Sequence, residues 1–174
     1  MLHNQMNDSE QLFQSAKAAF ECCAQSMCLT TELPYSEIVE QVPPDLAGAY
    51  LTLVADQGSV IIGIVSDRKG LEFLTRTMLG MEPSDDEVEI ADIADAMGEL
   101  ANVWGGQYKT DLASELQNIR IGLPMFAHGR IDAPRTSHTR IFKLVIDVIP
   151  VFIYISESLD EPVARKSDRS GKAA

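Results

Sequence analysis

The same succession of elements, a long helix followed by strand-like segments, occurs twice along this chain and constrains its fold more than any other feature. In the first half, Asp8 and Gln11 can form a capping box that opens a helix, and apolar residues recur at helical spacing from there to near Leu29. Three strand-like segments follow, at Tyr35–Val42, Ala47–Val54 and Ser59–Val65. The polar turn Ala55–Gly58 predicts that the last two strands form a hairpin.

The second half repeats this order after a short connecting helix. Asp67 and Gly80 are placed to cap the two ends of the connecting helix. Ser84–Glu87 has the pattern of a capping box with additional acid, and it predicts a long helix that runs to about Leu112. Four strand-like segments come next, at Ile119–Leu123, Met125–Ile131, Arg140–Val148 and Val151–Ser156. We therefore predict an α+β fold of two pseudo-symmetric halves, each a helix plus antiparallel strands, that share one sheet.

The chain length of 174 residues suits a single domain, which we predict over residues 8–156. Residues 157–174 are polar, of mixed charge and almost devoid of large apolar side chains, so we expect a disordered tail there. Cys22, Cys23 and Cys28 fit neither a disulfide framework nor a common zinc spacing, which indicates buried helix thiols in a reducing cytoplasm.

Acidic residues outnumber basic ones by 26 to 14, which gives a formal net charge of −12. This balance disfavours binding to nucleic acid or to an anionic membrane surface, because both attract cations. It favours a partner with a basic patch, although surplus acid also simply keeps a protein soluble. No secretory signal is visible, and the most apolar stretch, Ile141–Ile155, is too short to span a membrane as a helix. We predict a cytoplasmic protein that contacts neither nucleic acid nor membrane.

A polar stripe follows one face of the long helix in the second half. Asp95, Glu99 and Asn102 share this face because they are four and three residues apart. Apolar residues are predicted roughly opposite, and they are Ile90, Met97, Leu100, Ala101, Trp104 and Tyr108. A carboxylate beside a carboxamide can bind a cationic side chain and orient a water molecule, although a polar outer face is also the default for an amphipathic helix.

Three glycines, Gly98, Gly105 and Gly106, surround the stripe, where each costs about 1 kcal/mol relative to alanine. Asn102 is itself a poor residue for a helix interior. Gly106 falls on the stripe and would let another backbone approach closely, which indicates a surface cleared for a docking partner. Other chemistry is not visible, because the sequence lacks the common nucleophile and phosphate-binding motifs and its three histidines lack metal-ligand spacing.

The residues around this stripe resemble the CheC/CheX/FliY family of chemotaxis phosphatases. The family motif places Asp or Ser, Glu and Asn on one helix and a proline after it. Here Asp95, Glu99 and Asn102 are followed by 21 residues and then Pro124, one residue short of the family spacing. The flanking sequences also resemble the family, at Thr77–Gly80, Glu99–Gly105 and Ile121–Pro124. Because the first helix carries no second Glu-x-x-Asn, the chain is similar to the CheX branch.

The resemblance implies hydrolysis of the aspartyl phosphate on a phosphorylated CheY-type receiver domain. By this resemblance Asn102 orients the attacking water and Glu99 pairs with the receiver lysine, so these two are the expected catalytic residues. The expected partner-binding residues are Asp95, Gly98, Gly106 and Pro124. The receiver supplies its own Mg²⁺, and the protein is expected to need no metal or cofactor. The resemblance further implies a homodimer.

Two other interpretations stay open. The protein could be a non-catalytic module that binds a receiver or a flagellar-switch component. A purely structural dimerisation domain explains less, since it gives no reason for Asn102 among glycines.

Overall fold

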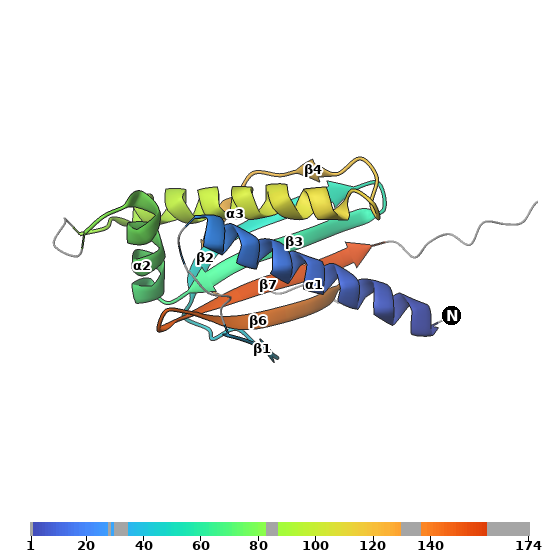
Figure 1. The fold of residues 1–174 in the computed structure, drawn as a ribbon, viewed down its shortest axis with the longest axis horizontal. Helices are drawn as coiled ribbons and strands as arrows, with labels where there is room; N and C mark the ends of the chain where they lie inside the picture. The colour runs from blue at the N-terminus through green and yellow to red at the C-terminus, as the bar shows by residue number, and fades with distance from the viewer. Residues whose placement is uncertain (1, 28, 30–34, 83–86, 130–136, 160–174) are drawn as a thin grey trace, which may run out of the picture.

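The computed structural model describes residues 2–27, 29, 35–82, 87–129 and 137–159, and the order of its elements is the predicted one. Within these residues three helices combine with a seven-stranded antiparallel sheet (Figure 1). The helices are α1 (Leu2–Ser26), α2 (Arg68–Leu79) and α3 (Ile90–Leu112). The strands are β1 (Tyr35–Val39), β2 (Ala47–Ala55), β3 (Gly58–Ser66), β4 (Arg120–Ile121), β5 (Met125–His128), β6 (His138–Ile146) and β7 (Ile149–Leu159). None of the described helices is long and apolar enough to cross a membrane.

The sheet joins the two halves by exchanging their first strands. Its order is β1-β6-β7-β3-β2-β4, and β5 also pairs with β2. The β2–β3 hairpin of the first half meets the β6–β7 hairpin of the second through the β3–β7 pair. β1 crosses to pair with β6, and β4 and β5 cross to pair with β2. The prediction of two similar halves that share one antiparallel sheet is confirmed.

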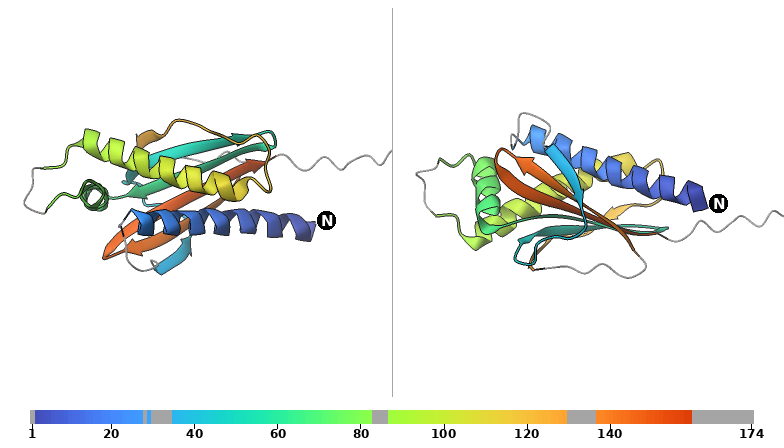
Figure 2. Two further views of the ribbon diagram at one scale, coloured as in Figure 1. Left: turned by 45° about the horizontal axis from the view of Figure 1, so that its top comes forward. Right: turned by 90° about the horizontal axis from the view of Figure 1, so that it is seen from below.

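α1 and α3 lie side by side on one face of the sheet, and α3 lies between α1 and β4 (Figures 1 and 2). Trp104 Nε1 donates a hydrogen bond to the carbonyl oxygen of Ala16 (2.8 Å), and Tyr108 Oη donates to that of Leu12 (3.1 Å). The Phe20 and Trp104 rings meet edge to face at 5.2 Å. Both polar atoms of these buried aromatic residues are therefore satisfied, and α3 is held firmly against α1.

α2 lies across one end of the sheet, beside the start of α3 (Figures 1 and 2). The Asp67 carboxylate accepts a hydrogen bond from the backbone N–H of Gly70 (2.8 Å), which caps the first turn. Gly80 ends the helix with φ 64°, a conformation that glycine adopts without a steric penalty. Both predicted caps are confirmed.

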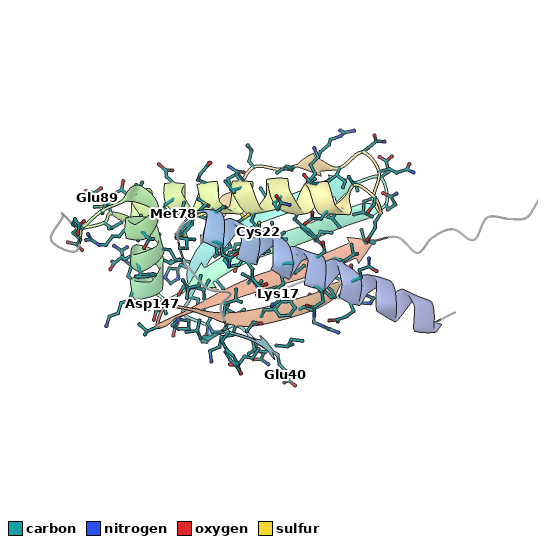
Figure 3. All side chains as sticks on the ribbon, in the orientation of Figure 1. Lys17, Cys22, Glu40, Met78, Glu89 and Asp147 are labelled. Atoms are coloured by element: carbon teal, nitrogen blue, oxygen red, sulfur yellow. The ribbon has the colours of Figure 1, made fainter. Side chains whose placement is uncertain are left out.

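The starts of the two long helices were predicted wrongly. α1 begins at Leu2 and Asp8 lies inside it, because residues 2–7 contain no glycine or proline that would stop the helix. α3 begins at Ile90, where the Asp92 carboxylate accepts from the backbone N–H of Glu89 (3.2 Å; Glu89 is labelled in Figure 3). Glu89 and Asp92 therefore cap the helix in place of the predicted pattern, and Glu87 precedes the helix. Residues 84–86 lie outside the described residues.

Several strands also begin or end at residues other than the predicted ones. β7 continues past Ser156 to Leu159, because residues 157–159 pair with residues 58–60 of β3. The beginning of the predicted tail is thus a strand, and residues 160–174 lie outside the described residues. β1 ends at Val39 rather than Val42. The end of the predicted strand Met125–Ile131 lies outside the described residues, which show β5 only to His128.

Of the two cysteines that the structure describes, Cys23 is buried as predicted and Cys22 is not. Burial raises the pKa of the Cys23 thiol to about 11, so it stays protonated and unreactive at neutral pH. Cys22 is exposed on α1 (labelled in Figure 3), which contradicts the prediction. Cys28 lies outside the described residues.

Candidate active site

The polar stripe of α3 faces away from the core, as predicted. Asp95, Glu99 and Asn102 are exposed, whereas the opposite face of the helix is buried. Five of the residues predicted for that face are fully buried, and they are Met97, Leu100, Ala101, Trp104 and Tyr108. Ile90, which was predicted on the apolar face, is instead 53% exposed at the first position of the helix.

A hollow of about 440 Å³ lies between this stripe and the β5 edge of the sheet. Its lining consists of Ala94, Asp95, Gly98, Glu99, Asn102, Pro124 and Phe126. The tertiary structure thus brings together five of the six predicted site residues, including Pro124 from beyond the helix. Gly106 is not part of the lining and lies one helical turn past Asn102.

Pro124 lies against α3, and residues before and after it in the chain pair with β2. A Cβ built on Gly98 would lie 3.6 Å from Pro124 Cγ, an ordinary van der Waals distance. The backbone N–H of Gly122 donates to the carbonyl oxygen of Thr52 (2.8 Å), and Met125 pairs with Tyr50 of β2. The proline therefore forms a fixed wall of the hollow, and an alanine at position 98 would also fit beside it.

The three polar side chains of the stripe have no partners within the described residues. No hydrogen bond or ion pair there engages Asp95, Glu99 or Asn102, although the nearby Gln107 bonds to Asp111 on the same helix (3.4 Å). Two carboxylates and one carboxamide thus face the hollow with their full capacity to bind. The carboxylates can bind a cationic side chain of a partner. The carboxamide can donate a hydrogen bond to a water molecule and accept one from it.

Two lining residues, Ala94 and Phe126, were not predicted from the sequence, and only Phe126 comes from outside α3. Its side chain lies on the helix-covered face because Phe126 pairs with Ala49, whose side chain is fully buried there. Only the register of β5 against β2 shows this, so no signal in the sequence could have assigned Phe126 to the site. Within the part of the chain that the structure describes, no three His, Cys, Asp or Glu side chains gather as a metal site.

The adjacent glycines Gly105 and Gly106 differ sharply in what surrounds them. A Cβ on Gly105 would lie 2.2 Å from Leu51 Cδ2, and Leu51 is itself buried. A Cβ on Gly106 would meet nothing within 4 Å. Packing within the chain therefore explains Gly105 and leaves Gly106 unexplained.

We expect opposite changes in stability when each of these glycines is replaced by alanine. Gly106→Ala should raise the free energy of unfolding by up to about 1 kcal/mol, the helix propensity difference. Gly105→Ala should lower it by about 1–3 kcal/mol, because the new methyl group overpacks against Leu51. Urea denaturation of the two variants measures both effects. A destabilised Gly106→Ala variant would contradict the open surroundings of this glycine.

The chain is similar to known chemotaxis proteins. The family model for the chemotaxis phosphatase CheX matches residues 50–141, more than half of the chain, and this range includes all six predicted site residues. Among curated protein sequences no match is found.

Solved structures show the same fold. The chemotaxis protein CheX from Desulfovibrio desulfuricans is 16% identical, with a TM-score of 0.68 over 84% of this chain and 99% of that one. A chain of the CheX-CheY-BeF3-Mg complex from Borrelia burgdorferi is 15% identical, with a TM-score of 0.64 over 86% and 97%. The FliM middle domain from H. pylori is 8% identical, with a TM-score of 0.56 over 85% and 92%.

Proposed function

The chain belongs to the CheX family of chemotaxis phosphatases, and we propose that it hydrolyses the aspartyl phosphate of a CheY-type receiver domain. The observation that carries this proposal is the hollow in which the partner-free side chains of Glu99 and Asn102 lie beside Pro124. The solved complex of a CheX with CheY and BeF3-Mg supports a receiver as the partner.

In the proposed reaction a water oxygen attacks the phosphorus, and the bond from phosphorus to the receiver carboxylate oxygen breaks. Inorganic phosphate and a free aspartate result. Phosphoryl transfer depends mainly on positioning and electrostatics, so a correctly placed water is the main contribution required from the phosphatase. The Asn102 carboxamide can accept a hydrogen bond from this water and donate one to a phosphoryl oxygen. Mg²⁺ belongs to the receiver in this proposal, which requires no metal ligand from this chain.

Glu99 lies one turn before Asn102 and is proposed to bind the lysine of the receiver active site. An ion pair there would fix the position of the receiver, and so the position of Asn102 relative to the phosphoryl group. Asp95 lies one further turn away and would add negative potential without touching the reacting atoms. Gly98, Gly106 and Pro124 are proposed as surfaces that the receiver approaches closely.

The basic test compares the decay of a phosphorylated receiver with and without the protein. Acceleration by catalytic amounts of protein supports the phosphatase. If no receiver from the same cell loses its phosphate faster, the proposed reaction is wrong.

We expect Glu99→Ala to lower kcat/KM by about 30-fold or more, because truncating one partner of a buried interfacial charge pair costs about 2 kcal/mol or more. Asp95→Ala should lower it less, since its carboxylate lies farther from Asn102 along the helix. Increasing salt should lower the kcat/KM of the wild type more than that of Glu99→Ala, because salt screens the ion pair that the variant lacks. Receiver titrations at two ionic strengths give these values, with the exposed Glu115→Ala as the control. Equal losses in the Glu115 and Glu99 variants would contradict a specific role for Glu99.

We also propose that the protein is a cytoplasmic homodimer, as members of the CheX branch are. Sedimentation equilibrium of the full chain tests the dimer, and a monomer at micromolar concentration would refute it.

The fold shared with the FliM middle domain favours one second candidate function. The protein would then be a non-catalytic module that binds a receiver or a flagellar-switch component. Tight binding of a phosphorylated receiver with an unchanged rate of phosphate loss would identify this function.

A further inference from the structure

Leu123 is the most exposed large apolar residue among those described, with 91% of its surface accessible. It immediately precedes Pro124, which lines the hollow beside Glu99 and Asn102. Its side chain contributes almost nothing to the core, although a single exposed leucine is unremarkable by itself. What distinguishes Leu123 is the backbone that holds it.

An extra residue in the edge strand places Leu123 in this position. Ile121 of β4 pairs with Leu53, and Met125 of β5 pairs with Tyr50. Between these pairs β2 has two residues, whereas the edge chain has three, residues 122–124. This mismatch is a β-bulge, a feature that re-aims a side chain and occurs often beside active sites.

The bulge is anchored on both sides. The Gly122 N–H bonds to Thr52 O (2.8 Å), and Pro124 packs at Gly98 of α3. A Cβ on Gly122 would lie only 3.1 Å from Thr52 O, so the close approach to β2 favours glycine there. Leu123 is therefore exposed between two fixed neighbours, and an exposed apolar group held in place loses little entropy when a partner covers it.

We propose that Leu123 is a docking residue, whose side chain is buried by the receiver when the receiver lysine reaches Glu99. The inference rests on the proposed function and identifies a second part of the same interface. The occupant is a CheY-type receiver that presents an apolar surface next to its active-site lysine. The continuity of Leu123 with the wall of the hollow and the carboxylates of Asp95 and Glu99 across that hollow favour this combination of apolar and cationic surfaces.

The test measures the affinity for a CheY-type receiver loaded with beryllofluoride and Mg²⁺, using titration calorimetry. Leu123→Ser should raise Kd about tenfold or more, as expected when the burial of one leucine side chain is lost. The kcat for the phosphorylated receiver at saturation should stay within about twofold, because uniform binding is lost. Leu123→Met should retain the wild-type Kd, since it conserves the apolar volume. Val148→Ser is the matched control, at a residue 78% exposed in the turn between β6 and β7.

Each other outcome overturns the inference in a distinct way. If the wild type accelerates dephosphorylation and Leu123→Ser binds equally well, docking by Leu123 is wrong and the phosphatase proposal stands. If kcat falls while Kd is unchanged, Leu123 affects the geometry of the site rather than docking. If Leu123→Ser changes the sedimentation of the free protein, the residue joins two copies of this chain. If the wild type neither binds nor accelerates any receiver, the proposed function itself fails.

Discussion

Asn102→Ala should abolish the acceleration of receiver dephosphorylation while leaving the fold intact. We expect kcat to fall by about 100-fold or more, the effect of removing one preorganised polar group that acts on the transition state. The affinity for the receiver should change little, because Glu99 and Leu123 remain. The exposed side chain of Asn102 makes no hydrogen bond or ion pair with the described residues, so its removal should leave the free energy of unfolding nearly unchanged.

Single-turnover decay of a phosphorylated receiver measures this effect, and binding of the beryllofluoride-loaded receiver is measured separately. Gln107→Ala is the matched control, since it removes an exposed carboxamide from the same helix without touching the hollow. If Asn102→Ala retains full activity, Asn102 does not position the water. If Gln107→Ala loses as much activity, the effect belongs to the helix and not to the site.

Trp104→Ala should cause the largest loss of stability, about 3–5 kcal/mol, as for other large aromatic residues truncated in a core. Trp104 is fully buried on the side of α3 opposite the hollow. The truncation removes the edge-to-face contact with Phe20 and the hydrogen bond to Ala16 O. It also leaves a cavity where α3 meets α1. Because the same packing holds α3 in place, catalytic activity should fall with stability.

Urea denaturation of the variant measures the change in the free energy of unfolding. Val103→Ala is the control, because Val103 is the preceding residue and is 36% exposed, so its truncation should cost much less. Trp104→Phe removes the hydrogen bond but keeps most of the aromatic volume. We expect the lost hydrogen bond to lower the free energy of unfolding by about 1 kcal/mol, in addition to the effect of the smaller buried area. A Trp104→Ala variant as stable as Val103→Ala would contradict the central packing role of this ring.

Local patterns in the sequence predicted local structure well. The caps at Asp67 and Gly80 and the hairpin turn at Ala55–Gly58 depend on neighbouring residues, and the structure confirms all three. The start of α1 was predicted wrongly, because Asp8 can cap a helix but no glycine or proline in residues 2–7 ends the helix before it. β7 extends to Leu159 through pairing with β3, a partner about 100 residues away in the sequence.

The sequence alone determined the polar stripe, since the 3.6-residue period of a helix puts Asp95, Glu99 and Asn102 on one face whatever surrounds them. Tertiary structure alone decided what that stripe faces. The pairing of β4 and β5 with β2 brings Pro124 and Phe126 against α3, and the one-residue mismatch in that pairing exposes Leu123. Strand register depends on contacts between residues that are far apart in the chain, and no local spacing encodes it. The catalytic candidates could therefore be predicted from the sequence, whereas the wall opposite them and the exposed position of Leu123 could not.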